Sequence, residues 1–410
     1  MLNSGDTGFM LICTALVFLM TPGLAFFYGG LSRRKNVLNT MMSSVFIMGL
    51  CSVMWILFGY SLSFGGNTGG IIGSLKHIAM NGIGMEDVTG SIPTYVFAAF
   101  QMMFALITPA LIGGAVAGRM KFKALFIFTA LWSIIVYYPM AHMVWGEGGL
   151  LGAGWLKSVD FAGGNVVHIS SGVTGLMLAI ILGKRQGVEK ASFRAHNIPF
   201  VLLGGGLLWF GWFGFNAGSA LAADGLAAHA FMTTNTSAAA ALVIWMLLDT
   251  VTHGKPTLTG AITGGVVGLI SITPGAGFVS LWAAMLIGGL GSVICFFAMS
   301  LIKKKLRIDD ALDAFGCHGI GGIWGGIATG IFADPRINSA ASGGLIFGET
   351  SQFVAQLISI AITIAVVVAG SLICVGITRL FTTLRVDAAS EELGLDTTQH
   401  GEEAYADGDL

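Results

Sequence analysis

The chain has 410 residues, of which 55% are hydrophobic and only 10% charged, and its formal net charge is −1. Soluble domains carry about 25% charged residues, so this composition excludes an ordinary soluble globular protein. The balanced charge also gives no basis for expecting a nucleic-acid partner. A mean hydropathy of +0.83 indicates an integral membrane protein.

Eleven apolar runs follow one another, most of them near the roughly 20 residues that a helix needs to cross a bilayer. Lipid offers the backbone no hydrogen bonds, so each run is expected to be helical. The eighth and tenth runs are short and glycine-rich, and they give the weakest signal. The runs lie at 7–28, 37–62, 95–118, 122–144, 165–182, 197–221, 228–252, 258–273, 281–301, 316–332 and 353–380.

The basic residues fix the expected orientation of these helices. Of the 20 Lys and Arg residues, 17 fall in alternate loops and the tail, and the opposite loops hold only Lys76, Lys157 and Arg336. The positive-inside rule then places the amino terminus outside and the carboxyl terminus in the cytoplasm. This orientation requires an odd number of spans, in agreement with eleven. We therefore expect a multi-pass protein of the cell membrane (plasma or inner membrane), surrounded by lipid.

An internal pattern recurs at an offset of 150 residues. Asp160 precedes His168 by eight positions, and Asp310 precedes His318 by the same spacing. The two copies fall on the fifth and tenth runs, so they enter the membrane from opposite faces. This predicts an all-α fold with a five-plus-five inverted repeat around a central pore. Glycines at matching offsets (172 and 175, 322 and 325) and a match between 110–116 and 261–267 support the repeat.

The sequence divides into two parts. A transmembrane domain is expected over 1–384, with repeat one at about 7–182, repeat two at about 197–332 and an extra helix at about 353–380. An acidic cytoplasmic tail follows over 385–410. It contains eight acidic residues and one basic residue, a composition that does not favour independent folding.

The two histidines are the first candidates for function, because an ionisable residue inside a membrane span is a functional hypothesis by default. A hydrogen-bonded core histidine is the alternative for each. Eight helical residues rise about 12 Å, so the repeat brings His168 and His318 toward each other near the midplane. Apolar surroundings disfavour the charged imidazolium. Two neutral rings in contact can bind a small polar solute or relay a proton.

Aromatic residues gather in several predicted spans. Phe100 and Phe104 lie one helical turn apart, Trp145 ends the fourth run, and the sixth run reads WFGFNAGS at 212–219. Such aromatics are either packing and interfacial residues or, together with a hydroxyl group, a cation–π cage at the outer mouth. An apolar constriction behind such a cage would exclude hydrated ions.

The acidic residues near the mouths also allow two interpretations. Asp160 either caps the fifth helix or also attracts a cation to the outer mouth. Asp310 and Asp313 are candidates for the corresponding role at the inner mouth, and Asp313 is equally placed to pair with a lysine of the cluster at 303–305.

Other reactive residue types give no site. The five cysteines lack a metal-ligand spacing and are interpreted as packing residues, and no phosphate-binding glycine motif is present. We expect no metal and no cofactor. The cysteines are Cys13, Cys51, Cys295, Cys317 and Cys374, and the histidines without an assigned role are His77, His142, His196, His229 and His253.

Several motifs together resemble the ammonium transporter (Amt/Rh) family on its microbial Amt side, through essentially the whole chain. They are FFYGGL at 26–31 with RKN at 34–36, DFAGG at 160–164 with HISSG at 168–172, WFGFNAGS at 212–219, DAFGCHG at 313–319, and GLD at 394–396 with HGE at 400–402.

The resemblance implies an eleven-helix homotrimer with one pore per subunit, transporting ammonium or ammonia, and a trimeric PII-type signal protein that docks on the cytoplasmic face. It also implies roles for individual residues. The outer ammonium site would comprise Phe100, Phe104, Trp145 and Ser219, supported by Asp160; the gate Phe104 and Phe215; and the pore His168, His318 and Trp212.

Deprotonation explains how such a pore would separate ammonium from potassium, which is similar in charge and size. Moving an intact ion through an apolar bore costs far more than a cage supplies, whereas neutral ammonia needs only hydrogen bonds from the histidines. The proton could follow through the histidine pair. Two other classes of protein are alternatives. One is an ammonium sensor that signals through the tail, and the other is a membrane enzyme with histidine-bound metal, for which the sequence lacks further ligands to complete a coordination shell.

Overall fold

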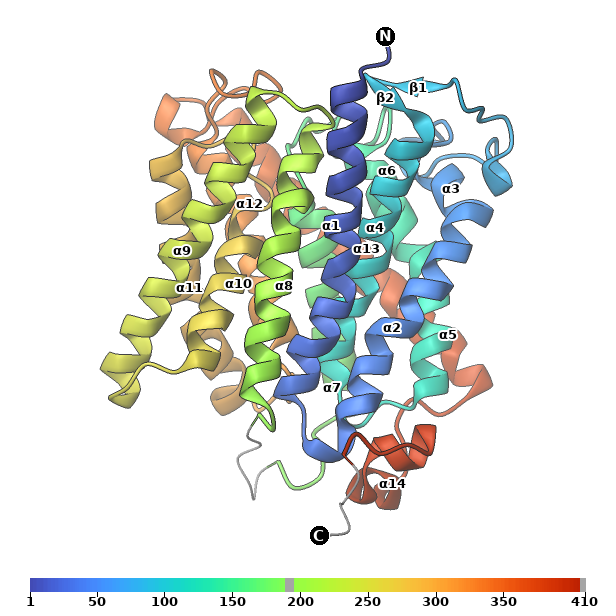
Figure 1. The fold of residues 1–410 in the computed structure, drawn as a ribbon, viewed down its shortest axis with the longest axis vertical. Coiled ribbons are helices and arrows are strands. Elements are labelled where there is room, and N and C mark those ends of the chain that lie inside the picture. Colours follow the sequence, from blue (N-terminus) through green and yellow to red (C-terminus); the bar gives the residue numbers. More distant parts are fainter. Residues whose placement is uncertain (189–194, 406–410) are drawn as a thin grey trace.

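The computed structural model describes residues 1–188 and 195–405, and within these ranges it is almost entirely helical. Long helices run side by side (Figure 1), and in this part the strands β1 (Val88–Thr89) and β2 (Ile92–Pro93) form one small antiparallel pair. The α-helices are α1 (Ser4–Leu31), α2 (Val37–Met54), α3 (Tyr60–Phe64), α4 (Thr94–Val116), α5 (Phe122–Trp132), α6 (Tyr138–Trp145), α7 (Ser170–Leu182), α8 (Ile198–Ala217), α9 (Gly225–His253), α10 (Leu258–Ile272), α11 (Leu281–Ser300), α12 (Ile320–Phe332), α13 (Ser351–Phe381) and α14 (Ala388–Leu393).

Short turns of other helix types join or extend these helices. π turns at Trp55–Gly59 and Ser133–Tyr137 connect α2 to α3 and α5 to α6. A π turn often marks a functional site, and two more of them lead into α7 and α12. The remaining turns are π turns at Gly164–Ile169, Leu301–Lys305, Phe315–Gly319 and Asp396–His400, and 3₁₀ turns at Arg34–Asn36, Ile78–Met80, Gly218–Ala220 and Leu345–Phe347.

Nine of the described helical segments are long and apolar enough to cross a membrane. They coincide with nine of the predicted runs, so the prediction of an all-helical, multi-pass membrane protein is confirmed. The eighth and tenth runs are also helical, as α10 and as the turn Phe315–Gly319 with α12, but α10 has only 15 residues. The count of eleven crossings, the orientation and the inverted repeat stay predictions.

Glycines allow the long helices to approach closely. A Cβ on Gly204 of α8 would lie 2.2 Å from the backbone nitrogen of Phe27 on α1, and one on Gly23 would lie 2.9 Å from Cβ of Leu207. Because these side chains are absent, α1 and α8 pack tightly, as small residues commonly permit between membrane helices.

The carboxyl-terminal tail packs against the bundle. In Figure 1, α14 lies at the end of the bundle opposite the amino terminus. Asn36 precedes α2 but makes no capping bond with its side chain. Instead, Asn36 Oδ1 accepts a hydrogen bond from the N–H of Leu395 (2.9 Å), and Asp396 Oδ1 accepts one from the N–H of Asn39 (2.8 Å). Asp396 therefore caps α2 from a position 357 residues away in the sequence.

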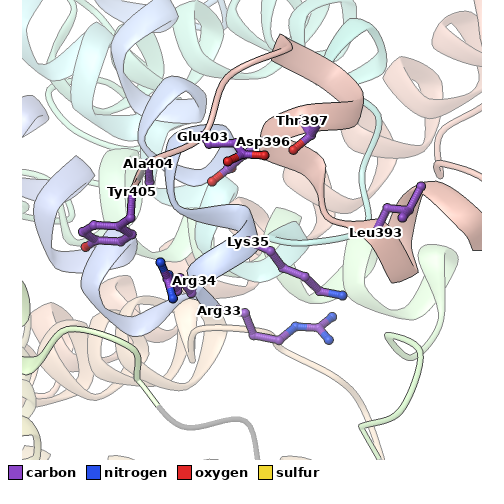
Figure 2. A pocket seen from close by; sticks show the side chains of 9 residues that line it. All are labelled: Arg33, Arg34, Lys35, Leu393, Asp396, Thr397, Glu403, Ala404 and Tyr405. Carbon is purple, nitrogen blue, oxygen red and sulfur yellow. The ribbon is translucent and has the colours of Figure 1, made fainter. Parts of the chain in front are cut away.

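A cavity of about 450 Å³ lies between this docked tail and the connection from α1 to α2. Figure 2 shows Tyr405 of the tail beside Arg34, whose guanidinium carbon lies 5.4 Å from the ring centroid. The tail and the first connection thus form one continuous surface. The cavity is lined by Arg33, Arg34, Lys35, Leu393, Asp396, Thr397, Glu403, Ala404 and Tyr405.

Candidate functional site

The two repeated histidines meet in the centre of the bundle. His168 Nδ1 lies 3.2 Å from His318 Nδ1, so one ring donates and the other accepts a hydrogen bond. The rings are 1% and 4% exposed, respectively. Each histidine lies in a π turn, at Gly164–Ile169 before α7 and at Phe315–Gly319 before α12. The structure therefore brings together the two residues that the sequence pattern pairs.

Glycines make this meeting possible. A Cβ on Gly172 would lie 2.2 Å from the backbone nitrogen of Gly319, and one on Gly322 would lie 3.0 Å from Cβ of His168. No side chain fits at Gly172 unless the helices shift. The glycines that follow each histidine at equal offsets thus let the two histidine-bearing segments cross in contact.

Asp160 caps the first of these segments. Its carboxylate accepts hydrogen bonds from the backbone N–H groups of Gly163 (2.9 Å), Gly164 (2.6 Å) and Asn165 (2.8 Å). Burial raises the pKa of Asp160, and these hydrogen bonds to the charged form oppose that rise. The contacts are those expected of the capping interpretation, and they leave a buried negative charge close to Trp145, whose Nε1–H donates to the Asp160 carbonyl oxygen (2.9 Å).

Asp310 makes the corresponding contacts in the second segment. Its carboxylate accepts hydrogen bonds from the N–H groups of Ala314 (3.0 Å), Phe315 (2.8 Å) and Gly316 (3.1 Å). Burial and the nearby Asp313 carboxylate raise the pKa of Asp310. Asp313 itself accepts a hydrogen bond from Lys303 Nζ (2.6 Å), which is the pairing that the sequence left open.

A cluster of aromatic rings lies beside His168, with the Phe215 ring 6.2 Å from the His168 ring. Phe104 packs edge-on against Phe100 (centroids 5.0 Å apart) and Trp145 (5.6 Å), and its ring lies 4.4 Å from that of Phe215. Phe104 and Phe215 are at most 1% exposed. Ser219 Oγ donates to the Phe215 carbonyl oxygen (2.8 Å), which leaves the hydroxyl oxygen able to accept another bond.

A small cavity lies behind these rings and reaches both histidines. Its volume is about 10 Å³, which is close to the minimum that holds one water-sized molecule. The Trp212 ring stacks on His168 with centroids 5.5 Å apart, and Trp212 Nε1–H donates to Thr273 Oγ1 (2.9 Å). His168 Nε2 is buried and has no hydrogen-bond partner among the described residues.

Sequence reasoning missed several residues around this site. Thr273 orients Trp212, and Tyr28 Oη–H donates to the Leu111 carbonyl oxygen (3.2 Å). A buried group of charges, Arg119, Arg185 and Asp309, lies beside Asp310. The adjacent pair Asp309 and Asp310 was the available signal, but nothing in the sequence identifies their distant partners.

The remaining reactive residues lie elsewhere. All five cysteines are buried and free, and residues 1–188 and 195–405 contain no group of three or more His, Cys, Asp or Glu suited to a metal ion. His142, which lies in the helical segment Phe122–Trp145, has Nδ1 2.9 Å from the Ser63 carbonyl oxygen. That contact is one expected of a structural core histidine.

Comparison with known proteins agrees with this architecture. The profile of the Ammonium Transporter Family matches residues 8–405. An ammonium transporter of Bacillus subtilis is 50% identical over 99% of this chain and 100% of the relative, and the ammonium transporter Amt1 of Archaeoglobus fulgidus is 45% identical over 98% and 100%. The crystal structure of Mep2 from Saccharomyces cerevisiae aligns with a TM-score of 0.91 at 37% identity, covering 100% of this chain and 93% of that one.

Nine described helical segments long and apolar enough to cross a membrane, together with the family match, define the class of this protein as a multi-pass transporter or channel, not an enzyme. Within that class, the chain belongs to the ammonium transporter family, and its substrate is ammonium.

Proposed function

We propose that ammonium binds at an outer aromatic cage, loses its proton at the gate, and crosses the membrane as ammonia beside the histidine pair. The unpartnered Nε2 of His168 supports this most directly, because a buried polar atom without a partner is costly and His168 lines a cavity large enough for one small molecule. The cage comprises Phe100, Phe104, Trp145 and Ser219 with Asp160, the gate Phe104 and Phe215, the pore His168, His318 and Trp212, and the inner mouth Asp310 and Asp313.

The proposed proton path runs through the same pair. An Nδ1–Nδ1 contact of 3.2 Å suits transfer between two rings, with one protonated at Nδ1 and the other not. A proton that follows ammonia by this route would make transport electrogenic. The apolar lining, which includes Leu24, Ile107 and Leu208, disfavours an intact cation.

The proposed topology has eleven crossings in a five-plus-five inverted repeat, with the amino terminus outside and the carboxyl terminus in the cytoplasm. The membrane domain would span 1–384 and the tail 385–410, in a plasma or inner membrane. The matched caps of Asp160 and Asp310, each ahead of a π turn with a histidine, support two related halves.

The proposed assembly is a homotrimer regulated by a PII-type protein at the cytoplasmic face. A groove of about 730 Å³ between α9 and α11 is lined mainly by apolar side chains, including the exposed Val243, Met285 and Leu290. Such a face suits contact with lipid or with another subunit. The docked tail supplies an ordered surface for a cytoplasmic partner.

A sensor is the second candidate function, because one similar structure is described as a sensor Amt protein, with a TM-score of 0.88 and 28% identity. The described part of the tail is short, with one α-helix and one π turn. Uptake of labelled methylammonium into vesicles separates the two functions, since a pure sensor moves no substrate.

Purified protein in liposomes provides the test of the transport mechanism. Ammonium and potassium gradients should be compared at several pH values, with wild-type protein and with Trp212→Phe, which removes the Nε1–H bond to Thr273 but keeps a ring on His168. We expect an ammonium current without a potassium current, and a smaller ammonium current in the variant. Equal ammonium and potassium currents in the wild type would overturn deprotonation at the gate.

A further inference from the structure

Two buried arginines hold the chain just ahead of the turn that carries His318. The Arg185 guanidinium makes a bidentate contact with the Asp309 carboxylate, in which Nε donates to Oδ2 (2.8 Å) and Nη2 donates to Oδ1 (2.7 Å). The backbone N–H of Arg185 also donates to Asp309 Oδ2 (2.8 Å). Arg119 Nη2 donates to the Asp309 carbonyl oxygen (2.6 Å). All three residues are at most 9% exposed. We call Arg119, Arg185 and Asp309 the inner clamp.

The inner clamp connects the end of α7 with the start of the segment that carries His318. Arg185 lies three residues beyond the end of α7, the helix that continues from the turn of His168. Asp309 is the neighbour of Asp310, whose carboxylate caps the turn of His318. A displacement of Asp309 would therefore move the Asp310 cap, and with it the His318 ring.

The charges of the inner clamp are fixed across the working pH range. Burial alone would raise the pKa of Asp309, but the hydrogen bonds and charge of Arg185 outweigh it and lower the pKa to about 2. Burial lowers the pKa of Arg119 to about 10, and the opposing attraction of Asp309 limits this effect. Both groups stay ionised near neutral pH, so the clamp is a permanent ionic contact.

The outer half is held differently. Ahead of His168, the Val159 N–H donates to Gln356 Oε1 (2.8 Å) and Gln356 Nε2 donates back to the Val159 carbonyl oxygen (2.8 Å). This neutral contact holds the residue next to Asp160, as the inner clamp holds the residue next to Asp310. In both halves, therefore, a contact holds the residue directly ahead of the capping aspartate. Such support from neighbouring residues helps to keep the two histidine rings in a fixed relative position.

We propose that Asp309, Arg185 and Arg119 are positioning residues for His318, which keep its Nδ1 within hydrogen-bond distance of His168 through the Asp310 cap. The inference rests on the proposed role of the histidine pair in proton transfer. It goes beyond that role by assigning the geometry of the pair to three residues that touch neither the substrate nor the rings.

The test uses full-length protein in liposomes, with ammonium current and labelled methylammonium uptake measured side by side to give the charge moved per molecule. Asp309→Asn and Arg185→Gln are compared with Arg336→Gln, which breaks the two-pronged Arg336–Asp334 contact, where Arg336 is 78% exposed. We expect current to fall about 10–100-fold in the first two variants, as for a misplacement of about 1 Å, with an altered charge per molecule and pH profile. The control should match the wild type.

Two further measurements make the result decisive. The double variant Asp309→Asn/Arg185→Gln should lose no more current than either single variant, because the residues act as one unit. If Asp309→Asn does not assemble, Arg185→Lys replaces it, since lysine keeps the charge but not the planar fork. Current and uptake that fall together, with an unchanged charge per molecule and pH profile, would show that the clamp only stabilises the fold.

The proposed function and this inference can fail separately. Wild-type charge per molecule in His318→Ala would overturn the proton path itself. A changed ratio in His318→Ala, together with wild-type behaviour of Asp309→Asn and Arg185→Gln, would overturn only the assignment of the inner clamp.

Discussion

The two halves of the site have the same core and different supports. In each, an aspartate caps a π turn that carries a histidine, and the two histidines are in contact. Around His168 the supports are neutral: Trp212 stacks on its ring and Gln356 holds the backbone ahead of Asp160. Near His318 the support is ionic, namely the ion pair between Arg185 and Asp309.

The difference follows from what each mouth must do. A fixed cation beside Asp160 would repel an approaching ammonium ion strongly, because water and salt screen buried charges little. The amide of Gln356 holds the backbone there without adding a charge. At the other end, Arg119, Arg185 and Lys303 lie among the carboxylates of Asp309, Asp310 and Asp313, so the formal charges balance where the proposed path delivers neutral ammonia. The aspartate and the histidine thus recur in both halves, where the proposed mechanism uses them. The supporting contacts differ, being neutral near the proposed cation site and ionic at the other end.

The largest expected effect comes from removing one histidine. His168→Ala should lower ammonium current at least about 100-fold, because proton transfer by a positioned group contributes a factor of that order, or leave a current only together with potassium leakage through the enlarged void. His318→Ala should also lower the ammonium current, and in this variant the His168 ring remains stacked on Trp212. Proteoliposome currents measure both effects.

The protein should still assemble in both histidine variants, because one polar side chain is a small part of the packing. Wild-type current with wild-type exclusion of potassium in His168→Ala would reduce the pair to a structural hydrogen bond, and the comparison of the two halves would lose its functional meaning.

The next effect concerns the contact between the halves. Gly172→Ala places a Cβ 2.2 Å from the Gly319 backbone, whereas Gly206→Ala places one where nothing lies within 4 Å. We expect the first variant to lose about 1–3 kcal/mol of stability through overpacking and to transport poorly, and the second to be nearly neutral. Thermal denaturation in detergent checks this, and equal stability of the two variants would contradict the close crossing.

Much of this arrangement can be predicted from the sequence, because it depends on short-range pattern. The apolar runs predict the helices, and the spacing of Asp160, His168, Asp310 and His318 predicts two related approaches to one point. The matched glycines support the repeat. These features are periodic or repeated, so they leave a signal in one chain.

The supports leave no such signal. Arg185 and Asp309 lie 124 residues apart, and Asp396 caps α2 across 357 residues. The positive-inside rule already accounts for an arginine in a basic loop. The sequence therefore gives no reason to expect that Arg185 is buried and paired with Asp309. The π turns are also unpredicted, because they result from packing and capping rather than from local propensity.

The outer cage should affect affinity by a smaller factor than the histidines affect rate. Trp145→Leu should raise the half-saturating ammonium concentration about fivefold, given a cation–π contact worth about 1 kcal/mol. Trp282→Leu is the matched control, since Trp282 is 53% exposed on α11 and packs edge-on against Phe332. An unchanged concentration dependence in Trp145→Leu would show that the aromatics near Asp160 serve only for packing.

The tail should affect the end of the bundle against which it packs. Removal of 387–410 takes away the cap that Asp396 provides to α2, a contact typically worth about 1 kcal/mol, and the contact of Glu391 with Arg385. We expect the truncated protein to remain assembled and to lose its normal response to a cytoplasmic regulator. Size-exclusion chromatography and current with a PII-type protein measure this; failure to assemble would make the tail structural.

The smallest expected effect is a pH dependence of tail docking. Burial lowers the pKa of His400 from its ordinary value near 6.5, against the opposing charges of Asp396 and Glu402. The docked tail therefore binds fewer protons than the free tail, so docking is complete above about pH 6.5 and weakens as the pH falls below it. Protonation also removes the acceptor at Nε2 that lies 3.0 Å from Asn39 Nδ2.

Hydrogen exchange of 394–405, corrected for the intrinsic rate, should be faster at about pH 5.5 than at about pH 7.5 if His400 stabilises docking in its neutral form. His196, which lies 3.0 Å from the Tyr405 hydroxyl and whose pKa burial also lowers, acts in the same direction. His400→Gln should therefore reduce the pH dependence, and a second change, His196→Gln, should remove most of what remains. Protection that is equal at both pH values in the wild type would exclude histidine protonation as a control of docking.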